Sequence, residues 1–210
     1  MVADSCARIC VEQASYFNND TRVIAKALDI LRQFNNAGIV DKPIMINNAQ
    51  VWVWQNEPRK GQKTLIEPFI ENYQKFNSNT GWKDDDDGWP QLMQALSHFS
   101  YHASGGSILL CDLQGGIYRN AVVITDPVIM SRNTNGYGPT DLGPTGISSF
   151  FSRHRCNCYC RAHWQRPREQ VSHHRARAGT SMVLAGAGYR RAPSRSSRPM
   201  ITYAEDDEYY

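Results

Sequence analysis

Two short apolar runs, each followed closely by an acidic residue, constrain this 210-residue chain more than any other feature. Ser107–Leu113 and Val122–Thr125 have the composition of buried strands. The first run carries Asp112, with Gln114 two residues later, and the second is followed at once by Asp126. Oxygen ligands at the ends of buried strands suit magnesium and phosphoryl transfer on a bound nucleotide. The pattern predicts a mixed α+β domain with a nucleotide site at the strand ends.

Two further motifs follow within about fifty residues of the first acid. The glycine-rich segment Tyr137–Gly146 allows backbone amides to approach phosphates closely. His154, Cys156 and Cys160 have the spacing of a metal clip. Each motif alone has a plainer explanation, since an aspartate at a strand end can cap a turn and glycine and proline mark loops. Their close succession favours the functional interpretation.

The charge and hydropathy pattern restricts partners and location. The formal net charge is only +3, and the sole acidic residue between Phe151 and Ala204 is Glu169. The arginine-rich tail from Arg168 lacks a pattern of interleaved aromatics and any recognised binding motif, which does not favour nucleic-acid binding. The first residues lack the basic region followed by an apolar run that is typical of a signal peptide. No segment approaches the ~20 consecutive apolar residues that a membrane helix needs. We therefore expect a cytoplasmic protein with reduced cysteines, without membrane insertion.

Periodicity and turn signals predict the elements between these motifs. Asp20 or Asn19 is expected to cap a helix that ends at Asn36, because Ile24, Ala27, Leu28, Leu31 and Phe34 share one face. The other expected elements are helices at Ser5–Ala14, from Pro90 to about Gly105 and at Ile147–Phe151, and strands at Pro43–Ile46, Gln50–Trp54 and Thr64–Phe69.

Seven sequence blocks, in order, resemble those of the atypical alpha-kinase family, and their amino-acid sequences are most similar to those of fungal members. The blocks are Glu67–Glu71, Lys75–Trp82, Ala95–Tyr101, Cys111–Gly115, Thr125–Pro127, Gly138–Gly146 and His154–Cys160. The resemblance covers residues 20–167. It implies the alpha-kinase fold, mainly its C-terminal lobe, and ATP-dependent phosphorylation of serine or threonine in a protein substrate.

The resemblance implies a role for each block. Asp112 matches the catalytic aspartate, and Gln114 and Asp126 match magnesium ligands. Glu67 through Phe69 match the hinge that binds adenine through its backbone. The glycine-rich motif near the nucleotide is matched by Gly138, Asp141, Gly143 and Gly146. Many members carry Asn at the position of Asp141, where a carboxylate would repel phosphates.

The resemblance also implies a structural zinc. His98, His154, Cys156 and Cys160 match its four ligands, which fill a closed tetrahedral site. His98 belongs to the helix that follows Pro90, so zinc would join that helix to the C-terminal segment. Cys158 lies inside the clip at a variable position, and its side chain could compete as a ligand.

The N-terminal lobe is expected to be incomplete. Residues 1–20 are interpreted as a remnant of that lobe or a leader, residues 21–167 as the kinase domain, and residues 168–210 as a disordered Arg/Ser-rich tail with an acidic end. Neither Lys26 nor Lys42 has the expected place of the lysine that contacts the nucleotide phosphates. The chain alone is therefore expected to be weakly active. The alternative is a non-catalytic, zinc-stapled pseudokinase scaffold.

Overall fold

The computed structural model describes residues 5–8, 16–47 and 49–178 and confirms an α+β fold. Its helices are α1 (Tyr16–Asn36), α2 (Trp89–Ala103) and α3 (Gly143–Arg153). Its strands are β1 (Ser5–Arg8), β2 (Ile44–Ile46), β3 (Gln50–Val53), β4 (Lys63–Pro68), β5 (Gln74–Lys75), β6 (Ile108–Cys111), β7 (Gln114–Ile117), β8 (Val122–Thr125) and β9 (Val128–Ser131). No helix in the described ranges is both long and apolar enough to cross a membrane.

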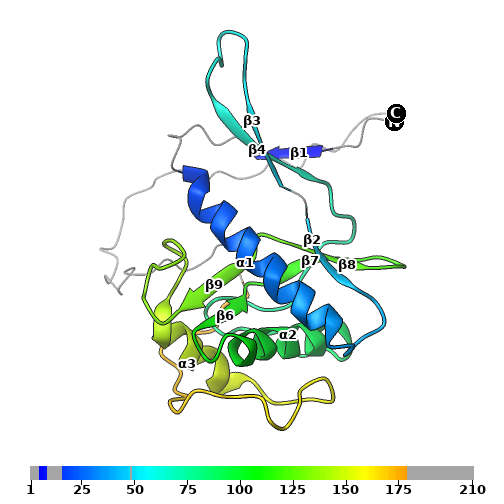
Figure 1. Cartoon of the computed structure of the whole chain (residues 1–210), viewed down its shortest axis with the longest axis vertical. Helices are drawn as coiled ribbons and strands as arrows, with labels where there is room; N and C mark the ends of the chain where they lie inside the picture. Colours follow the sequence, from blue (N-terminus) through cyan, green and yellow to red (C-terminus); the bar gives the residue numbers. More distant parts are fainter. Residues whose placement is uncertain (1–4, 9–15, 48, 179–210) are drawn as a thin grey trace, which may run out of the picture.

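Two strand groups at the centre of the molecule position the strand-end acids (Figure 1). A four-stranded sheet has the order β2-β8-β7-β5, in which β2 runs parallel to β8 and the other pairs are antiparallel. Strands β6 and β9 form a separate antiparallel pair. Because the chain turns from β6 into β7 and from β8 into β9, both turns lie between these two strand groups.

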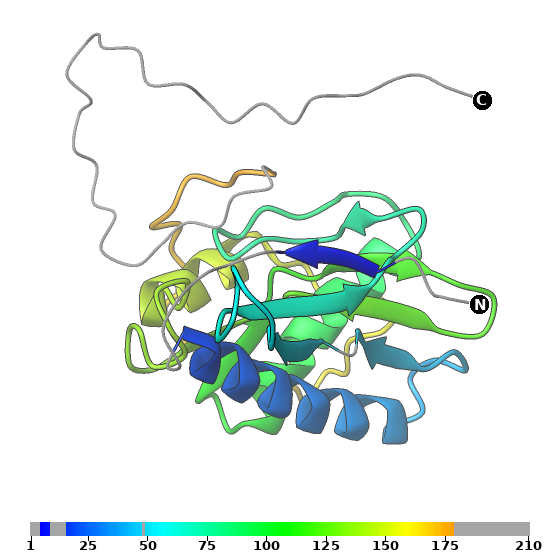
Figure 2. The same ribbon diagram turned by 90° about the horizontal axis from the view of Figure 1, so that it is seen from above.

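The helices enclose these strands with apolar side chains. α1 contacts β2 and α2, α2 packs on β6, and α3 packs on β9. Figure 2 shows α1 running along one side of the strands. Ala27 and Phe34 of α1 are fully or almost fully buried, as are Leu96 of α2 and Phe151 of α3. Burial of such side chains contributes roughly 1.5–3 kcal/mol each, which fixes the strand ends in place.

The third sheet, of order β1-β4-β3, projects from this body together with the turn between β3 and β4 (Figure 1). Its first strand contradicts the expected helix at Ser5–Ala14, because Ser5–Arg8 pairs antiparallel with Leu65–Pro68. Pairing with a distant strand overrides the local helical spacing. Residues 9–14 of that expected helix lie outside the described residues.

Most other elements agree with the sequence predictions, with two corrected boundaries. α1 begins at Tyr16, so Asn19 and Asp20 lie within the helix and do not cap it. α3 begins at Gly143, four residues before the expected start at Ile147.

The segment 168–178 contains no helix or strand but is attached to α3 by hydrogen bonds. Ser148 Oγ accepts a hydrogen bond from the Val171 amide and donates one to the Val171 carbonyl. The Arg177 amide donates to Thr80 Oγ1 at 3.1 Å. These contacts hold residues 168–178 along α3, and the rest of the tail expected to be disordered, residues 179–210, lies outside the described residues.

Candidate active site and metal centre

Asp112 lies at the turn between β6 and β7 and is 1% exposed. Its backbone φ of 57° is left-handed, a conformation uncommon outside glycine and concentrated at functional turns. Lys75 Nζ lies 3.0 Å from Asp112 Oδ1, and the Asn79 amide also donates to the carboxylate. Burial raises the pKa of Asp112, while the Lys75 charge opposes that rise. A buried carboxylate next to one ammonium group can orient a hydroxyl and accept its proton.

Gln114 and Asp126 lie beside this carboxylate because of the strand register. β7 and β8 pair Gln114 with Thr125, which places Asp126 one residue further along the neighbouring strand. The Gln114 amide nitrogen lies 3.5 Å from Asp112 Oδ2. Asp126 also has a left-handed φ, of 45°. The structure therefore brings Asp112, Gln114 and Asp126 to adjoining turns, as the sequence predicted. A carboxylate and an amide oxygen suit magnesium, which retains water and phosphate oxygens in its remaining positions.

A cavity of about 430 Å³ opens next to Asp126. Its walls come from the start of α1, from β2, β4 and β9, and from the loop that precedes α3. The lining residues are Asn19, Asp20, Val23, Ile24, Ile46, Asn47, Leu65, Glu67, Asp126, Pro127, Val128, Tyr137, Pro139 and Thr140. This size and the apolar walls with a few polar groups are typical of a small-molecule site, and its carboxylates would repel phosphates unless a cation lay between them.

Asp112 connects to this cavity through Asn79. The Asn79 side chain donates to the Thr140 carbonyl at 3.1 Å, and Thr140 lines the cavity. The backbone amide of the same residue donates to Asp112. Asn79 thereby ties the turn that carries Asp112 to the loop that forms one wall of the cavity.

The two ends of the expected hinge, Glu67 and Phe69, differ in their position relative to the cavity. Glu67 lines the cavity, where its carboxylate accepts a hydrogen bond from Thr125 Oγ1 at 2.7 Å. Phe69 is 61% exposed and is not among the residues that line this cavity. The backbone role of this segment toward adenine stays a prediction.

Asp141 is completely buried and organises the loop that precedes α3. Its Oδ1 accepts hydrogen bonds from the amides of Ser131 and Gly143, at 2.8 and 2.9 Å. Its Oδ2 accepts from the Ser131 hydroxyl at 2.6 Å and from the Tyr137 amide at 3.2 Å. The carboxylate therefore points into the loop, and the place near the nucleotide that the resemblance implies for Asp141 stays a prediction.

The glycines of this loop differ in their surroundings. A Cβ on Gly143 would lie 2.3 Å from Thr134 Oγ1, and one on Gly146 would lie 2.2 Å from Met130 Sδ. These two residues are required for close packing of α3, so their expected part in nucleotide binding stays a prediction. Gly138, with φ of 101°, borders Asn19 at the start of α1.

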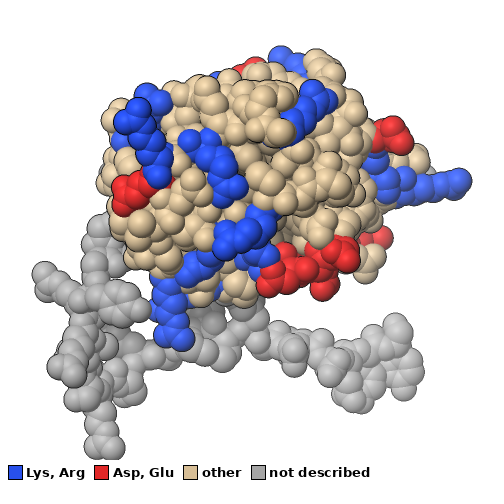
Figure 3. Space-filling model, turned by 90° about the horizontal axis from the view of Figure 1, so that it is seen from below, with Lys and Arg blue, Asp and Glu red and all other residues tan. Residues whose placement is uncertain are grey.

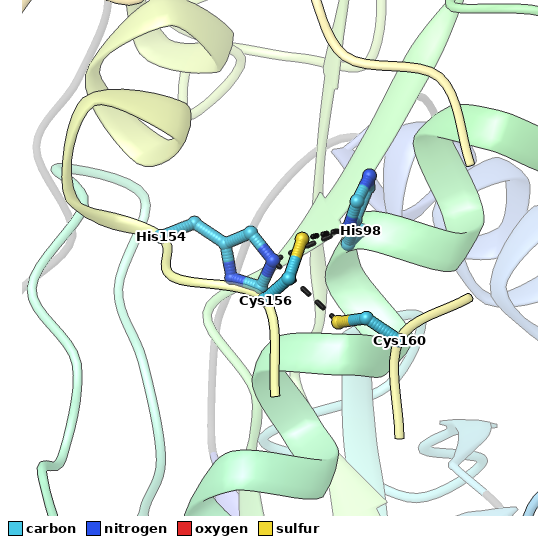
Figure 4. Close-up of side chains that lie close together, drawn as sticks. All are labelled: His98, His154, Cys156 and Cys160. Carbon is cyan, nitrogen blue, oxygen red and sulfur yellow. Dashed lines mark hydrogen bonds between the residues drawn. The ribbon is translucent and has the colours of Figure 1, made fainter. Parts of the chain in front are cut away.

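Four predicted zinc ligands converge from separate elements (Figure 4). His98 comes from α2, while His154, Cys156 and Cys160 follow α3. Their potential ligand atoms all lie within 4.8 Å of one another. His154 Nε2 is 3.2 Å from His98 Nδ1 and 3.7 Å from Cys160 Sγ. Tetrahedral Zn–N and Zn–S bonds place neighbouring ligand atoms about 3.3–3.8 Å apart, which matches this spacing.

The protonation states of this cluster also fit a metal. Burial lowers the pKa of His98 to about 4 and that of His154 to about 3, so both imidazoles are neutral near pH 7. His98 Nε2 lies 3.0 Å from the Gln165 carbonyl, an arrangement that leaves Nδ1 free as a ligand. Burial raises the pKa of the Cys160 thiol to about 11, a cost that a bound cation would offset. Cys158 is exposed and lies outside the convergent group.

Three residues with contacts at this site were not assigned roles from the sequence. Asp20 lines the cavity, and partial burial together with the Asp126 charge raises its pKa. From the sequence, Asp20 was expected to cap a helix. Lys75 and Asn79 both contact Asp112. They belong to the block Lys75–Trp82, and only the three-dimensional pairing reveals their positions.

Comparison with known proteins agrees with this architecture. A sequence model of the alpha-kinase family matches residues 1–160. Alpha-protein kinase 1 of Dictyostelium discoideum is 35% identical over 151 residues, which are 71% of this chain and 10% of that protein. Elongation factor 2 kinase of Rattus norvegicus is 33% identical over 122 residues, which are 57% of this chain and 16% of that protein. The chain thus spans only a small part of these curated relatives.

Solved structures give the same result. The alpha-kinase domain of myosin heavy chain kinase A in complex with ADP is 28% identical, with a TM-score of 0.61, and the match covers 71% of this chain and 58% of that one. An alpha kinase from Entamoeba histolytica has a TM-score of 0.64 at 21% identity, over 82% of this chain and 72% of that one, which shows the shared fold. The chain belongs to the alpha-kinase family.

Proposed function

We propose that this chain is the catalytic part of a serine/threonine protein kinase that transfers the terminal phosphoryl group of ATP to a protein hydroxyl. The arrangement of Asp112 with Lys75, Gln114 and Asp126 carries the proposal. Of these residues Asp126 lines the cavity of about 430 Å³, and Asn79 links Asp112 to the wall of that cavity at Thr140. The complexes of a relative with ADP and with ATP support nucleotide binding by the same fold.

Each residue has a role that follows from its position. Asp112 orients the acceptor hydroxyl and takes its proton, because it is buried and its raised pKa favours proton acceptance. Lys75 holds the Asp112 carboxylate and balances negative charge as the phosphoryl group moves. Gln114 and Asp126 offer oxygen atoms for magnesium, which when bound would neutralise charge on the nucleotide phosphates.

We further propose one structural zinc per chain, held by His98, His154, Cys156 and Cys160. The convergence of the four ligand atoms and the neutral imidazoles support it. Zinc would cross-link α2 to the segment after α3. Reduced thiols are required for this role, which agrees with the expected cytoplasmic location.

The scaffold alternative is favoured by the positions of two lysines. Lys26 pairs with Asp29 on α1, and Lys42 Nζ donates to the Tyr118 carbonyl. Among the described residues neither lysine lines the cavity, so neither contacts nucleotide phosphates there. Loss of one preorganised contact in an active site costs about 10²–10³ in rate. We therefore expect the chain alone to be slower than a longer protein that supplies such a lysine.

We propose a protein as the substrate and do not expect nucleic acid to bind. On the face shown in Figure 3, basic side chains are dispersed and a group of acidic side chains lies beside several of them. A surface of mixed sign attracts a polyphosphate backbone weakly.

The proposal is tested by magnesium-dependent transfer from γ-labelled ATP to a generic basic protein, followed by phosphoamino-acid analysis. We expect transfer of label to serine or threonine, and no transfer when EDTA is present to chelate the magnesium. Asp126→Asn should abolish ATP binding and transfer, whereas Asp86→Asn, in an exposed loop, should leave both unchanged. ATP binding without transfer, by the chain and by a version with an added lysine-bearing lobe, would support the scaffold alternative.

A further inference from the structure

The chain folds back over the predicted zinc centre shortly after its last ligand. Trp164 is 6% exposed, and its ring meets the His98 ring edge to face with their centroids 5.4 Å apart. The Gln165 carbonyl lies 3.0 Å from His98 Nε2, and Arg166 Nη1 donates to Cys156 Sγ at 3.5 Å. Three successive residues outside the ligand set therefore contact two of its members.

Arg166 also joins this centre to the end of α3. Its Nη2 has three acceptors within hydrogen-bond distance, the carbonyls of Phe151 and His154, both at 3.2 Å, and Gln170 Oε1 at 2.8 Å. Its guanidinium carbon lies 5.5 Å from the centroid of the Phe151 ring. Carbonyls at the end of a helix lack intrahelical donors and form the negative end of its dipole. One guanidinium thus caps α3 and contacts a ligand sulfur at the same time.

The sulfur that Arg166 contacts is one that needs such a partner. Cys156 and Cys158 are both exposed and lie two residues apart, so the zinc ligand set has a competing thiol close by. A thiolate keeps negative charge after it binds a metal, and a hydrogen bond from a charged donor is about twice as strong as one between neutral groups. The guanidinium stays charged and holds several acceptors in a fixed geometry.

We propose that Arg166 is a positioning residue that keeps the Cys156 thiolate in the zinc centre, an inference that rests on the proposed structural zinc. Its hydrogen bond withdraws negative charge from the sulfur, and its contacts with the carbonyls of Phe151 and His154 fix that sulfur relative to α3. Cys156, and not Cys158, then fills the fourth ligand position. Loss of an outer partner of a metal ligand typically lowers metal affinity by about 10–100-fold.

The first test is competition for zinc between the whole chain and a chromogenic chelator of known affinity. Arg166→Gln removes the charge and replaces the fork with one amide, so we expect zinc affinity to fall by about 10–100-fold. Arg166→Lys keeps the charge on a single nitrogen and should give an intermediate affinity. Arg161→Gln is the matched control, since the Arg161 guanidinium donates to the Ala37 carbonyl at 2.8 Å, and it should keep the parental affinity.

Cobalt substitution separates a hydrogen bond to sulfur from a general effect on packing. This hydrogen bond stabilises the lone pairs of the thiolate, so in Arg166→Gln the thiolate-to-cobalt charge-transfer band should move to longer wavelength. The d–d bands should keep a tetrahedral pattern, and Arg161→Gln should match the parent in both. Iodoacetamide should label Cys158 before Cys156 in the zinc-loaded parent, and Cys156 should be labelled faster in Arg166→Gln.

The outcomes separate this inference from the proposed zinc. A parent chain that holds zinc, with parental affinity and an unmoved band in Arg166→Gln, overturns the role of Arg166 and leaves the ligand set intact. Lower affinity with an unmoved band would show that Arg166 only supports the packing of α3, and it also overturns the inference. Labelling of Cys156 before Cys158 in the zinc-loaded parent does the same. A parent chain without zinc overturns both proposals together.

Discussion

Replacement of Asp141 separates a structural role for this carboxylate from contact with the nucleotide. Its two oxygens accept four hydrogen bonds, three of them from backbone amides. In Asp141→Asn one oxygen becomes an NH₂ group, which cannot accept. The least costly orientation directs NH₂ toward the Ser131 hydroxyl, which accepts once its single proton is donated to the Asn133 carbonyl and no longer to residue 141. Only the Tyr137 amide then loses its partner.

The expected destabilisation follows from this count. One buried donor without an acceptor costs about 1–3 kcal/mol, so we expect Asp141→Asn to lower the free energy of unfolding by that amount. Asp141→Ala leaves the amides of Ser131, Tyr137 and Gly143 without acceptors and should cost about 3 kcal/mol or more. Affinity for ATP should be unchanged in Asp141→Asn, because Asp141 is not among the cavity-lining residues.

Urea unfolding at constant m-value measures the first quantity, and calorimetric titration with Mg-ATP measures the second. Ser131→Ala is the control, since it removes one hydroxyl and leaves three amide bonds to the carboxylate. An Asp141→Asn protein with parental stability and altered ATP affinity would refute the structural role. The carboxylate would then contact the nucleotide, as the sequence first indicated.

The remaining predictions concern the metal centre and the base. Freshly purified chain should contain about one zinc, and Cys160→Ala should lose it with a clear fall in melting temperature, since structural zinc contributes folding free energy. Cys158→Ala, an exposed neighbour in the same loop, should retain zinc and stability, so equal zinc content in both variants would contradict the ligand set. The acidic limb of the kcat/KM profile should lie above the usual pKa range of an aspartate, because burial raises the pKa of Asp112 and the base is protonated, and inactive, as pH falls through that raised value. The test compares this profile in the variants Asp112→Glu and Lys75→Met. An acidic limb at the same pH in both variants as in the parent would show that another group is titrating.

The zinc set and the metal-site residues were predictable because their signals are local or carried by characteristic blocks. His154, Cys156 and Cys160 are close in sequence, and only His98 required the resemblance. Asp112 and Asp126 follow buried strands, and the β7–β8 register brings their turns together. The four residues whose ligand atoms converge are those of the predicted set.

The residues that the sequence analysis missed depend on long-range pairing. Lys75 reaches Asp112 because β5 pairs with β7, aligning Lys75 with Gln114 across almost forty residues of chain. Asp20 was expected to cap α1 because polar residues precede the apolar face of this helix. α1 instead begins at Tyr16, four residues before Asp20. Ser5–Arg8 was expected to begin a helix, yet it forms a strand because β4 supplies an antiparallel partner. Sequence periodicity contains none of these tertiary contacts.

Phosphoryl transfer by the parent chain and by Asp112→Asn tests the central claim most directly. Asn retains the size of the side chain and a hydrogen bond acceptor for the Asn79 amide, but it cannot take a proton. With magnesium, γ-labelled ATP and a basic protein acceptor, we expect measurable transfer by the parent and a loss of about 10²–10⁴-fold in Asp112→Asn, with ATP affinity preserved. Equal transfer by the two proteins would contradict the assignment of Asp112 as the catalytic base.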